Sequence, residues 1–230
     1  MLTKVGAVNA VSLRVEGKPN YFSMRRTSSE VESANRLEFF RSIGFDASSV
    51  ARGEQVHGVA VTFVERPGDY PATDSLVTRK QNLLLGISVA DCVPILIVDR
   101  ESQTIAAVHA GWRGTANRIT AKTIAYMKTK LDSRSEDIFA FVGPSAGVCC
   151  YEVGEEVAEN FPSEYYIRSD HSGKYRVDLK KLNFAELMES GLPKENLEIS
   201  EACTICDWNY HSYRRDGPAG GRMLAVIGLK

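Results

Sequence analysis

Three residues in this sequence, His57, Cys92 and His109, have side chains that could bind one metal ion together. Two imidazoles and one thiolate fill three corners of a tetrahedral zinc site, and the fourth corner stays open for water or substrate, as in catalytic zinc centres. The spacing of the three residues matches none of the compact zinc-finger motifs. The prediction of a zinc site at His57, Cys92 and His109 therefore depends on residue type and local context.

Each of these residues also fits a role without metal. A single cysteine among apolar residues is usually a small core residue, and a single histidine at a strand end usually makes an ordinary hydrogen bond. Asp91, next to Cys92, interrupts an apolar stretch. Burying a carboxylate without partners is costly, so we predict that Asp91 has polar partners.

The elements that would position these residues follow from the apolar pattern. Four amphipathic helices are predicted, at residues 29–44, 115–131, 155–161 and 178–190. Strands are predicted at Val5–Val15, Val59–Val64, Leu83–Asp99, Ile105–His109, Ile138–Val142, Tyr175–Leu179 and Met223–Leu229. Several strands are apolar almost throughout, which indicates that both of their faces are covered. The predicted fold class is α/β, a layered sandwich with a central mixed β-sheet flanked by helices.

Length and composition favour one compact unit. The chain has 230 residues, and no linker or internal repeat divides it, so we predict a single domain over residues 1–230. With 28 Lys and Arg against 29 Asp and Glu, it offers no broad basic surface for nucleic acid or acidic lipid. The N-terminal residues lack the apolar core of a signal peptide, and no apolar run approaches the roughly 20 residues of a membrane span. A cytoplasmic protein that binds neither nucleic acid nor membrane is expected.

The cysteine pattern predicts reduced thiols. Five cysteines are too few for a secreted disulfide scaffold. Cys203 and Cys206 form a C-x-x-C pair, but no second such pair or nearby pair of histidines completes a zinc cage. The adjacent Cys149 and Cys150 are poorly placed to form an ordinary disulfide with each other. We therefore predict against a redox or metal role for Cys203 and Cys206, and the sequence leaves their actual role open.

Nine short motifs, distributed over most of the chain, resemble those of one known family. They are Phe22–Arg25, Ala34–Arg36, Gln55–Gly58, Thr73–Thr78, Ala90–Pro94, His109–Gly114, Gly143–Ser145, Cys150–Gly154 and Ser212–Gly217. In order and density they resemble the YfiH-like family, also called peptidoglycan editing factor, polyphenol oxidase or laccase-domain purine nucleoside phosphorylase. The resemblance implies a layered α/β sandwich and places the family's zinc ligands on His57, Cys92 and His109.

The resemblance also implies an activity, which is phosphorolysis of adenosine, inosine, guanosine and methylthioadenosine, together with deamination of adenosine. The partners would then be a purine nucleoside and inorganic phosphate, and zinc would be the cofactor. Phosphorolysis needs groups that hold an anion, and our candidates are Arg25 and Arg113. A surface or helix-end salt bridge is the alternative role for each arginine. A multicopper laccase cluster would need more imidazoles than the four histidines present.

Two other functions remain open at this point. In the first, the protein is a cysteine-type hydrolase acting on peptidoglycan precursors, with Cys92 as nucleophile and His109 as base. In the second, zinc only holds three strand ends together in a scaffold, which a fourth side-chain ligand would favour. The segment Tyr213–Gly217 fits either a substrate-facing role or a turn held by an Arg–Asp pair. The sequence leaves the preferred nucleoside and the oligomeric state open.

Overall fold

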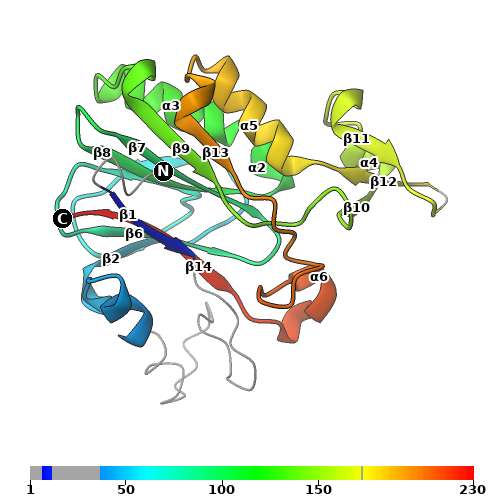
Figure 1. Cartoon of the computed structure of the whole chain (residues 1–230), viewed down its shortest axis with the longest axis horizontal. Coiled ribbons are helices and arrows are strands. Elements are labelled where there is room, and N and C mark those ends of the chain that lie inside the picture. The colour runs from blue at the N-terminus through cyan, green and yellow to red at the C-terminus, as the bar shows by residue number, and fades with distance from the viewer. Residues whose placement is uncertain (1–6, 12–36, 172) are drawn as a thin grey trace.

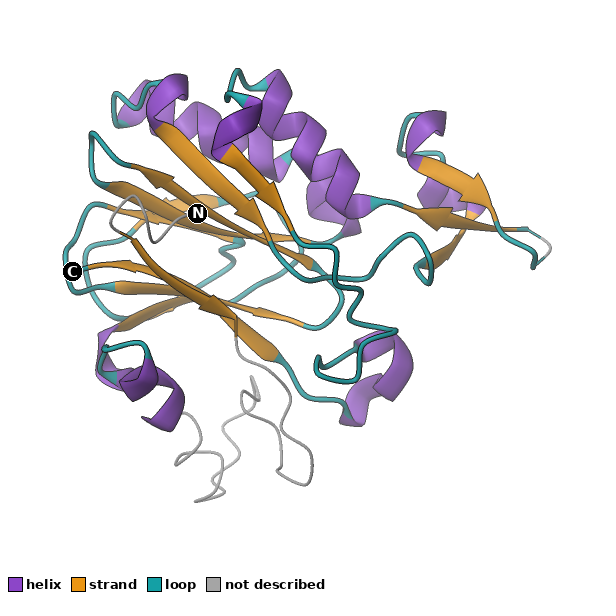
Figure 2. Cartoon of the chain, viewed as in Figure 1, coloured by secondary structure: helices purple, strands orange, loops and turns teal. Residues whose placement is uncertain are grey.

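Two stacked β-sheets form the centre of the molecule, and helices lie on the outside (Figure 1; Figure 2). The computed structural model describes residues 7–11, 37–171 and 173–230. The larger sheet has six strands in the order β13-β9-β7-β8-β5-β3. Their bounds are β3 Val61–Phe63, β5 Ser75–Thr78, β7 Val93–Asp99, β8 Thr104–Ala110, β9 Ile138–Val142 and β13 Leu197–Ile199. The sheet is mixed, because β13 and β3 join its edges in parallel pairs and the inner pairs are antiparallel.

The second sheet has five strands in the order β1-β14-β6-β2-β4. Their bounds are β1 Ala7–Val11, β2 Val50–Gly53, β4 Gly68–Tyr70, β6 Leu84–Val89 and β14 Met223–Leu229. A small antiparallel sheet, which projects from one end of the molecule in Figure 2, has the order β10-β12-β11. Its strands are β10 Glu152–Gly154, β11 Tyr166–Arg168 and β12 Lys174–Val177.

Three helices cover the outer face of the six-stranded sheet, and the helical residues 37–42 pack against β14 of the five-stranded sheet (Figure 1). Those that lie over the six-stranded sheet are α2 Trp112–Ala116, α3 Ile119–Lys130 and α5 Leu179–Glu189. The two short ones are α4 Glu155–Ala158, beside the small sheet, and α6 Tyr213–Asp216, before β14. Short 3-10 turns are found at Ala47–Ser49, Ser135–Asp137, Ser163–Tyr165, Lys194–Asn196 and Gly217–Ala219.

Side-chain alternation along the strands explains why the central strands are so apolar. In β7, Ile95 and Ile97 face the core beneath the helices, whereas Leu96 and Val98 face the second sheet. In β14, Ile227 faces the first sheet, and alternate residues of the strand pack under Phe40 and Phe45. Since successive residues point to opposite faces and both faces are covered, most positions along these strands are apolar, and the polar ones lie toward the strand ends. The predicted layered α/β class is confirmed, and one of the two covering layers is a second sheet.

Several predicted elements have different boundaries in the structure. The helix predicted over 115–131 is two helices, α2 and α3, separated at Arg118, whose φ is 61°. The strand predicted over 83–99 is β6 and β7, separated by a turn in which Asp91 has a φ of 83°. Residues 37–42 are helical, and the rest of the helix predicted over 29–44 lies outside the described residues. The strands that the sequence did not indicate, such as β10 and β13, are mostly three or four residues long, too short to show a period.

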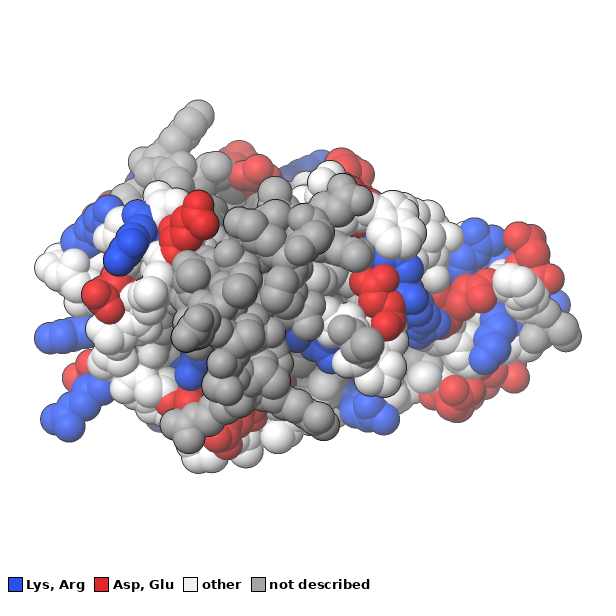
Figure 3. Space-filling view, turned by 90° about the horizontal axis from the view of Figure 1, so that it is seen from below, with Lys and Arg blue, Asp and Glu red and all other residues white. Residues whose placement is uncertain are grey.

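The surface carries both basic and acidic side chains (Figure 3), as the near-equal numbers of the two in the sequence predict. On the face shown in Figure 3, the visible basic and acidic side chains are intermixed. In the described part of the chain, no helix is both long and apolar enough to cross a membrane.

Glu186 on α5 is a buried carboxyl group that accepts a hydrogen bond from the backbone N–H of Ala121 at 3.2 Å. Burial raises the pKa of Glu186 from 4.5 to about 7, against the opposing effect of that hydrogen bond. A carboxyl group whose folded pKa lies above its unfolded pKa binds its proton more tightly in the folded chain. Stability is therefore lost as the pH rises from about 4.5 to about 7.

We predict that Glu186→Gln raises the free energy of unfolding at pH 8 by about 2 to 3 kcal/mol, because the neutral amide avoids the cost of the buried charge. Near pH 4 the two proteins should be almost equally stable. Urea unfolding at both pH values measures the difference. The control is Glu189→Gln, since Glu189 is exposed on the same helix and pairs with Arg118. A loss of stability in Glu186→Gln at pH 8 would contradict the prediction.

Candidate active site

The side chains of His57, Cys92 and His109 lie together at one end of the stacked sheets. His57 comes from the loop between β2 and β3, Cys92 from the turn between β6 and β7, and His109 from β8. Their possible ligand atoms all lie within 4.8 Å of one another. The His57 Nε2 atom lies 3.9 Å from Cys92 Sγ, and the two imidazole centroids are 4.8 Å apart, edge to face. Tertiary structure thus brings together three residues that are far apart in sequence, here called the His–Cys–His cluster.

Asp74 positions both histidines of the cluster. Its Oδ1 atom lies 2.8 Å from His109 Nδ1, and the side chains of both residues are buried. The same carboxylate accepts hydrogen bonds from the backbone N–H groups of Val56, His57 and Gly58, at 3.2, 3.0 and 2.8 Å. His57 itself has a φ of 59°, a conformation that needs such support in a residue other than glycine. Asp74 therefore orients the His109 ring and holds the turn that carries His57.

A glycine leaves the space that the cluster needs. A Cβ atom on Gly111 would lie 2.9 Å from His57 Cδ2 and 3.2 Å from Cys92 Sγ. Both distances are shorter than a normal van der Waals contact, so a side chain at this position would displace the cluster. The glycine after β8 thus lets the backbone pass directly behind the two side chains.

Cys92 and His109 stabilise each other's charged forms. Burial by itself would raise the pKa of the Cys92 thiol, but the charge of His109 and hydrogen bonds to both imidazoles lower it to about 6. Burial would lower the pKa of His109, but the Cys92 thiolate and the hydrogen bond to Asp74 raise it to about 9. In the absence of metal, the cluster therefore favours a Cys92 thiolate paired with a protonated His109 at neutral pH. The thiolate is the form that a metal ion or an electrophile requires, and binding of a metal ion would displace the proton of His109.

The carboxylate of Asp91 attaches the C-terminal loop to the cluster. It accepts hydrogen bonds from the Thr204 hydroxyl at 2.7 Å, the Ser212 hydroxyl at 3.0 Å and the Arg214 backbone N–H at 2.7 Å. These donors follow β13 and are more than a hundred residues away in the sequence. The prediction that Asp91 has polar partners is confirmed, and the structure shows that these partners are distant in sequence. Because Cys92 is the next residue, this contact also fixes the position of its thiol.

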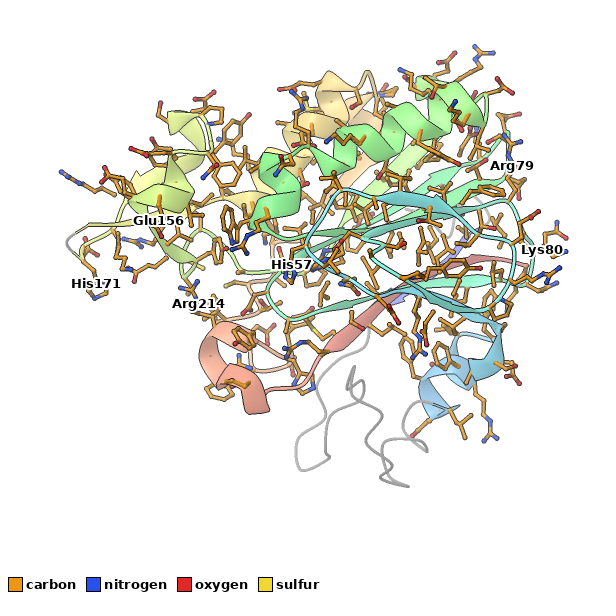
Figure 4. The ribbon with its side chains drawn as sticks, turned by 180° about the vertical axis from the view of Figure 1, so that it is seen from behind. His57, Arg79, Lys80, Glu156, His171 and Arg214 are labelled. Carbon is orange, nitrogen blue, oxygen red and sulfur yellow. The ribbon has the colours of Figure 1, made fainter. Side chains whose placement is uncertain are left out.

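Cationic and aromatic side chains lie beside the cluster. The Arg113 guanidinium stacks over the Trp112 ring at 4.4 Å, in the turn of chain that follows His109. The Arg214 guanidinium lies 5.3 Å from the centroid of the Tyr151 ring. Burial, together with the charge of Cys92, raises the pKa of Tyr151 to about 12, so the phenol keeps its proton. Figure 4 shows the labelled Arg214 between α6 and the small sheet.

Arg25, the other arginine predicted to bind an anion, lies outside the described residues, and its role stays a prediction. The Arg–Asp alternative for residues 213–217 is confirmed for one of the two arginines there. Arg215 forms a two-point ion pair with Asp216, through Nε and Nη2 at 2.8 Å each, and donates to backbone carbonyls of the loop. Arg214 instead faces Tyr151 and donates to the carbonyl of Glu152.

Sequence reasoning assigned no role to Asp74. A signal was present, because an acidic residue directly before the buried strand Ser75–Thr78 must find donors. The sequence could not show that one of those donors is an imidazole, because His109 contacts Asp74 only through the antiparallel pairing of β5 and β8.

The donor set of the His–Cys–His cluster suits a metal ion such as zinc. A tetrahedral ion with bonds of about 2.0 Å to nitrogen and about 2.3 Å to sulfur separates its two nitrogen ligands and one sulfur ligand by about 3.3 to 3.5 Å. The observed separations, up to 4.8 Å, need only small side-chain movements to reach this geometry. Among the residues that the structure describes, no fourth His, Cys, Asp or Glu joins the cluster. The arrangement therefore offers three protein ligands and an open position.

Comparison with known proteins identifies the family. Residues 13–230 match the family described as multi-copper polyphenol oxidoreductase laccase. A purine nucleoside phosphorylase of Deinococcus radiodurans is 41% identical over 201 residues, which are 85% of this chain and 76% of that protein. An adenosine deaminase, RL5, from an unknown prokaryotic organism is 33% identical and covers 84% of this chain and 79% of its own length. The crystal structure of YlmD from Geobacillus stearothermophilus matches with a TM-score of 0.90 and 30% identity, over 98% of this chain and 92% of that one.

The chain thus belongs to this family, the same YfiH-like group that its motifs resemble. The copper in the family's description does not fit the residues found here. Only two of the four histidines, all of which are described, lie in the cluster, and His171 instead pairs with Glu152 at 2.8 Å. A multicopper centre needs many imidazoles around several ions. The cluster has ligands for one ion.

We predict that Asp74→Asn weakens binding of a divalent ion by about 10- to 100-fold, because an amide cannot accept all four hydrogen bonds or hold the His109 ring. Competition with a chromophoric chelator measures the affinity. The control is Asp99→Asn, a buried carboxylate at the other end of β7 that accepts hydrogen bonds from the backbone N–H groups of Glu101 and Ser102. It should lose stability and keep its metal affinity. Equal affinities in the two variants would show that Asp74 does not support a metal site.

Proposed function

We propose that this protein is a zinc-dependent purine nucleoside phosphorylase that also deaminates adenosine. The observation that carries the proposal is the convergence of two imidazoles and a thiolate, which leaves a fourth coordination position open. The Asp74 carboxylate supports this arrangement through its hydrogen bond to the His109 ring. The names of relatives that cover most of the chain support the two reactions. The proposed substrates are adenosine, inosine, guanosine and methylthioadenosine, with inorganic phosphate as the second substrate. We propose a cytoplasmic location, where the free thiols would stay reduced.

In phosphorolysis, a phosphate oxygen forms a bond to the anomeric carbon of the nucleoside while the bond from that carbon to the purine nitrogen breaks. A zinc ion held by His57, Cys92 and His109 would supply a Lewis acid that orients the nucleoside or acidifies a water molecule. The protein itself must hold the phosphate and keep the reactants in line. Arg113 is exposed, and its stacking on Trp112 limits its motion, so it is suited to hold an anion at the edge of the cluster. Arg25 is the second proposed phosphate ligand.

Deamination uses the same site with water in place of phosphate. Water adds to the purine carbon that bears the amino group, and ammonia leaves. The proton released by the water needs an acceptor, and the proton donor for ammonia must lie near the same carbon. One open position can support both reactions, because both need an oxygen nucleophile directed at a nucleoside in the same pocket.

One observation favours a second candidate function. Cys92, His109 and Asp74 form a line of nucleophile, base and orienting carboxylate, which is the arrangement of a cysteine hydrolase. In that function Cys92 would attack an amide in a peptidoglycan precursor without metal. Metal analysis separates the two candidates, because stoichiometric zinc lost in Cys92→Ala favours the phosphorylase. A metal-free protein that iodoacetamide alkylates at Cys92 favours the hydrolase.

We predict that the purified protein converts adenosine to adenine only when phosphate is present, and to inosine without it. His57→Ala, Cys92→Ala and His109→Ala should each abolish nucleoside turnover and leave a folded protein, because each removes one ligand from a site with no spare. Chromatography of the products and circular dichroism measure the two effects. Turnover retained in all three variants would refute the assigned role.

Arg113→Ala should raise the KM for phosphate about tenfold or more and change the KM for adenosine much less, because a charged hydrogen-bond donor to the anion is lost. Initial rates at varied phosphate and fixed adenosine measure the effect. The control is Arg134→Ala, beyond the other end of α3, where the guanidinium pairs with Glu136 at the surface. If both variants bind phosphate as the parent does, Arg113 is not a phosphate ligand.

A further inference from the structure

Four of the five cysteines gather at a second site. Cys149 and Cys150 lie in the turn between β9 and β10, and Cys203 and Cys206 lie in the loop after β13. All four sulfur atoms lie within 4.8 Å of one another. Cys206 Sγ is 3.6 Å from Cys149 Sγ and 3.0 Å from Cys150 Sγ. The two pairs come from segments more than fifty residues apart, so the fold has brought together what we name the four-cysteine cluster.

The sequence prediction of no metal role for Cys203 and Cys206 missed this cluster. The prediction looked for a second C-x-x-C pair, whereas the other two thiols come from the adjacent residues Cys149 and Cys150. Adjacent cysteines are a poor disulfide pair, but nothing prevents both from binding the same ion when a turn directs their side chains to one point. The periodicity of the sequence does not indicate that these four cysteines converge.

The separations fit a single tetrahedral ion. Four thiolates at about 2.3 Å from one zinc ion lie about 3.8 Å from one another. The observed range, from 3.0 Å to at most 4.8 Å, brackets that value for all four sulfurs at once. Two separate disulfides would need close approach only within each pair. An iron–sulfur cluster would need thiols spread around several iron atoms.

The backbone around the cluster is arranged for a negatively charged sulfur. The N–H group of Gly147 donates to Cys203 Sγ at 3.2 Å. A thiolate accepts such a hydrogen bond more strongly than a neutral thiol, so this donor suits a metal-bound sulfur. A Cβ atom on Gly147 would lie 3.1 Å from Cys203 Cβ and 3.2 Å from Cys149 Sγ. The glycine thus allows the two turns to approach closely.

The cluster stands beside the candidate active site and has no open position of its own. The Thr204 N–H donates to the Ser145 carbonyl at 3.0 Å, and its hydroxyl binds Asp91, the neighbour of Cys92. Tyr151, which stacks against Arg214, directly follows Cys150. A link between the two turns at the four-cysteine cluster would therefore hold together the two segments that carry Thr204 and Tyr151 beside the candidate active site.

We propose that Cys149, Cys150, Cys203 and Cys206 bind one structural zinc ion through four thiolates. A zinc ion with four protein ligands has no position for substrate, so its contribution is to folding and to the position of the loop 199–216. This second zinc goes beyond the proposed phosphorylase activity, because it does not depend on which reaction the His–Cys–His cluster performs.

The test measures the zinc content of the full chain by inductively coupled plasma mass spectrometry. The protein is purified with reductant and without chelator. We expect two zinc ions per chain in the parent and one in Cys149→Ser/Cys206→Ser. The matched control is Cys92→Ser, which should also hold one, at the four-cysteine cluster. If the His–Cys–His cluster binds no zinc, the parent holds one ion and the Cys149→Ser/Cys206→Ser variant none, so failure of the proposed function is distinguishable. Zinc content unchanged by Cys149→Ser/Cys206→Ser overturns the proposal.

A second measurement on the unaltered sequence covers the case in which the serine variant fails to fold. Cobalt exchanged into the protein should show the absorption of a tetrahedral site with four thiolates, in addition to any signal from the His–Cys–His cluster. Titration with a mercurial should release zinc as four thiols react. Iron in place of zinc, or disulfides among these cysteines in protein kept reduced, would each overturn the proposal.

Discussion

The buried carboxylate of Asp74 is the interaction on which the site depends. It bonds to the His109 ring from one side and to three backbone N–H groups of the turn around His57 from the other. An uncompensated charge in this position would be costly, so the four hydrogen bonds to the Asp74 carboxylate must form together when the chain folds. One residue thereby couples the β5–β8 pairing to the loop that presents His57, and the two imidazoles cannot move independently.

A second buried carboxylate, that of Asp91, does the same for the segment that carries Cys92. Asp91 has a positive φ in the turn between β6 and β7 and gathers donors from Thr204, Ser212 and Arg214. The C-terminal loop is thus attached to the residue next to Cys92. Because both acids lie at ends of strands that belong to a rigid double sheet, the cluster between them is positioned by the core of the fold.

The double sheet explains why such a site can form on short turns. Strands β7 and β8 are buried on one face by α3 and α5 and on the other by the second sheet, so their ends are held on all sides. The mutual stabilisation of the Cys92 thiolate and the His109 imidazolium needs this burial, since water would screen the charges. The turns after β8 and β9 contain the close contacts at Gly111 and Gly147, where a side chain would not fit.

The sequence by itself determined the α/β class, the long apolar strands such as β9 and β14, and the residue types His57, Cys92 and His109, because these depend on local periodicity and on side-chain chemistry. Only the tertiary structure decided that Asp74 supports both histidines and that Arg215 binds within its own loop while Arg214 faces Tyr151. It also decided that four cysteines converge on one point. Such arrangements depend on contacts between residues many positions apart, which a local pattern does not encode. Short strands without a period and side chains held by distant partners become visible only when the sheets are assembled.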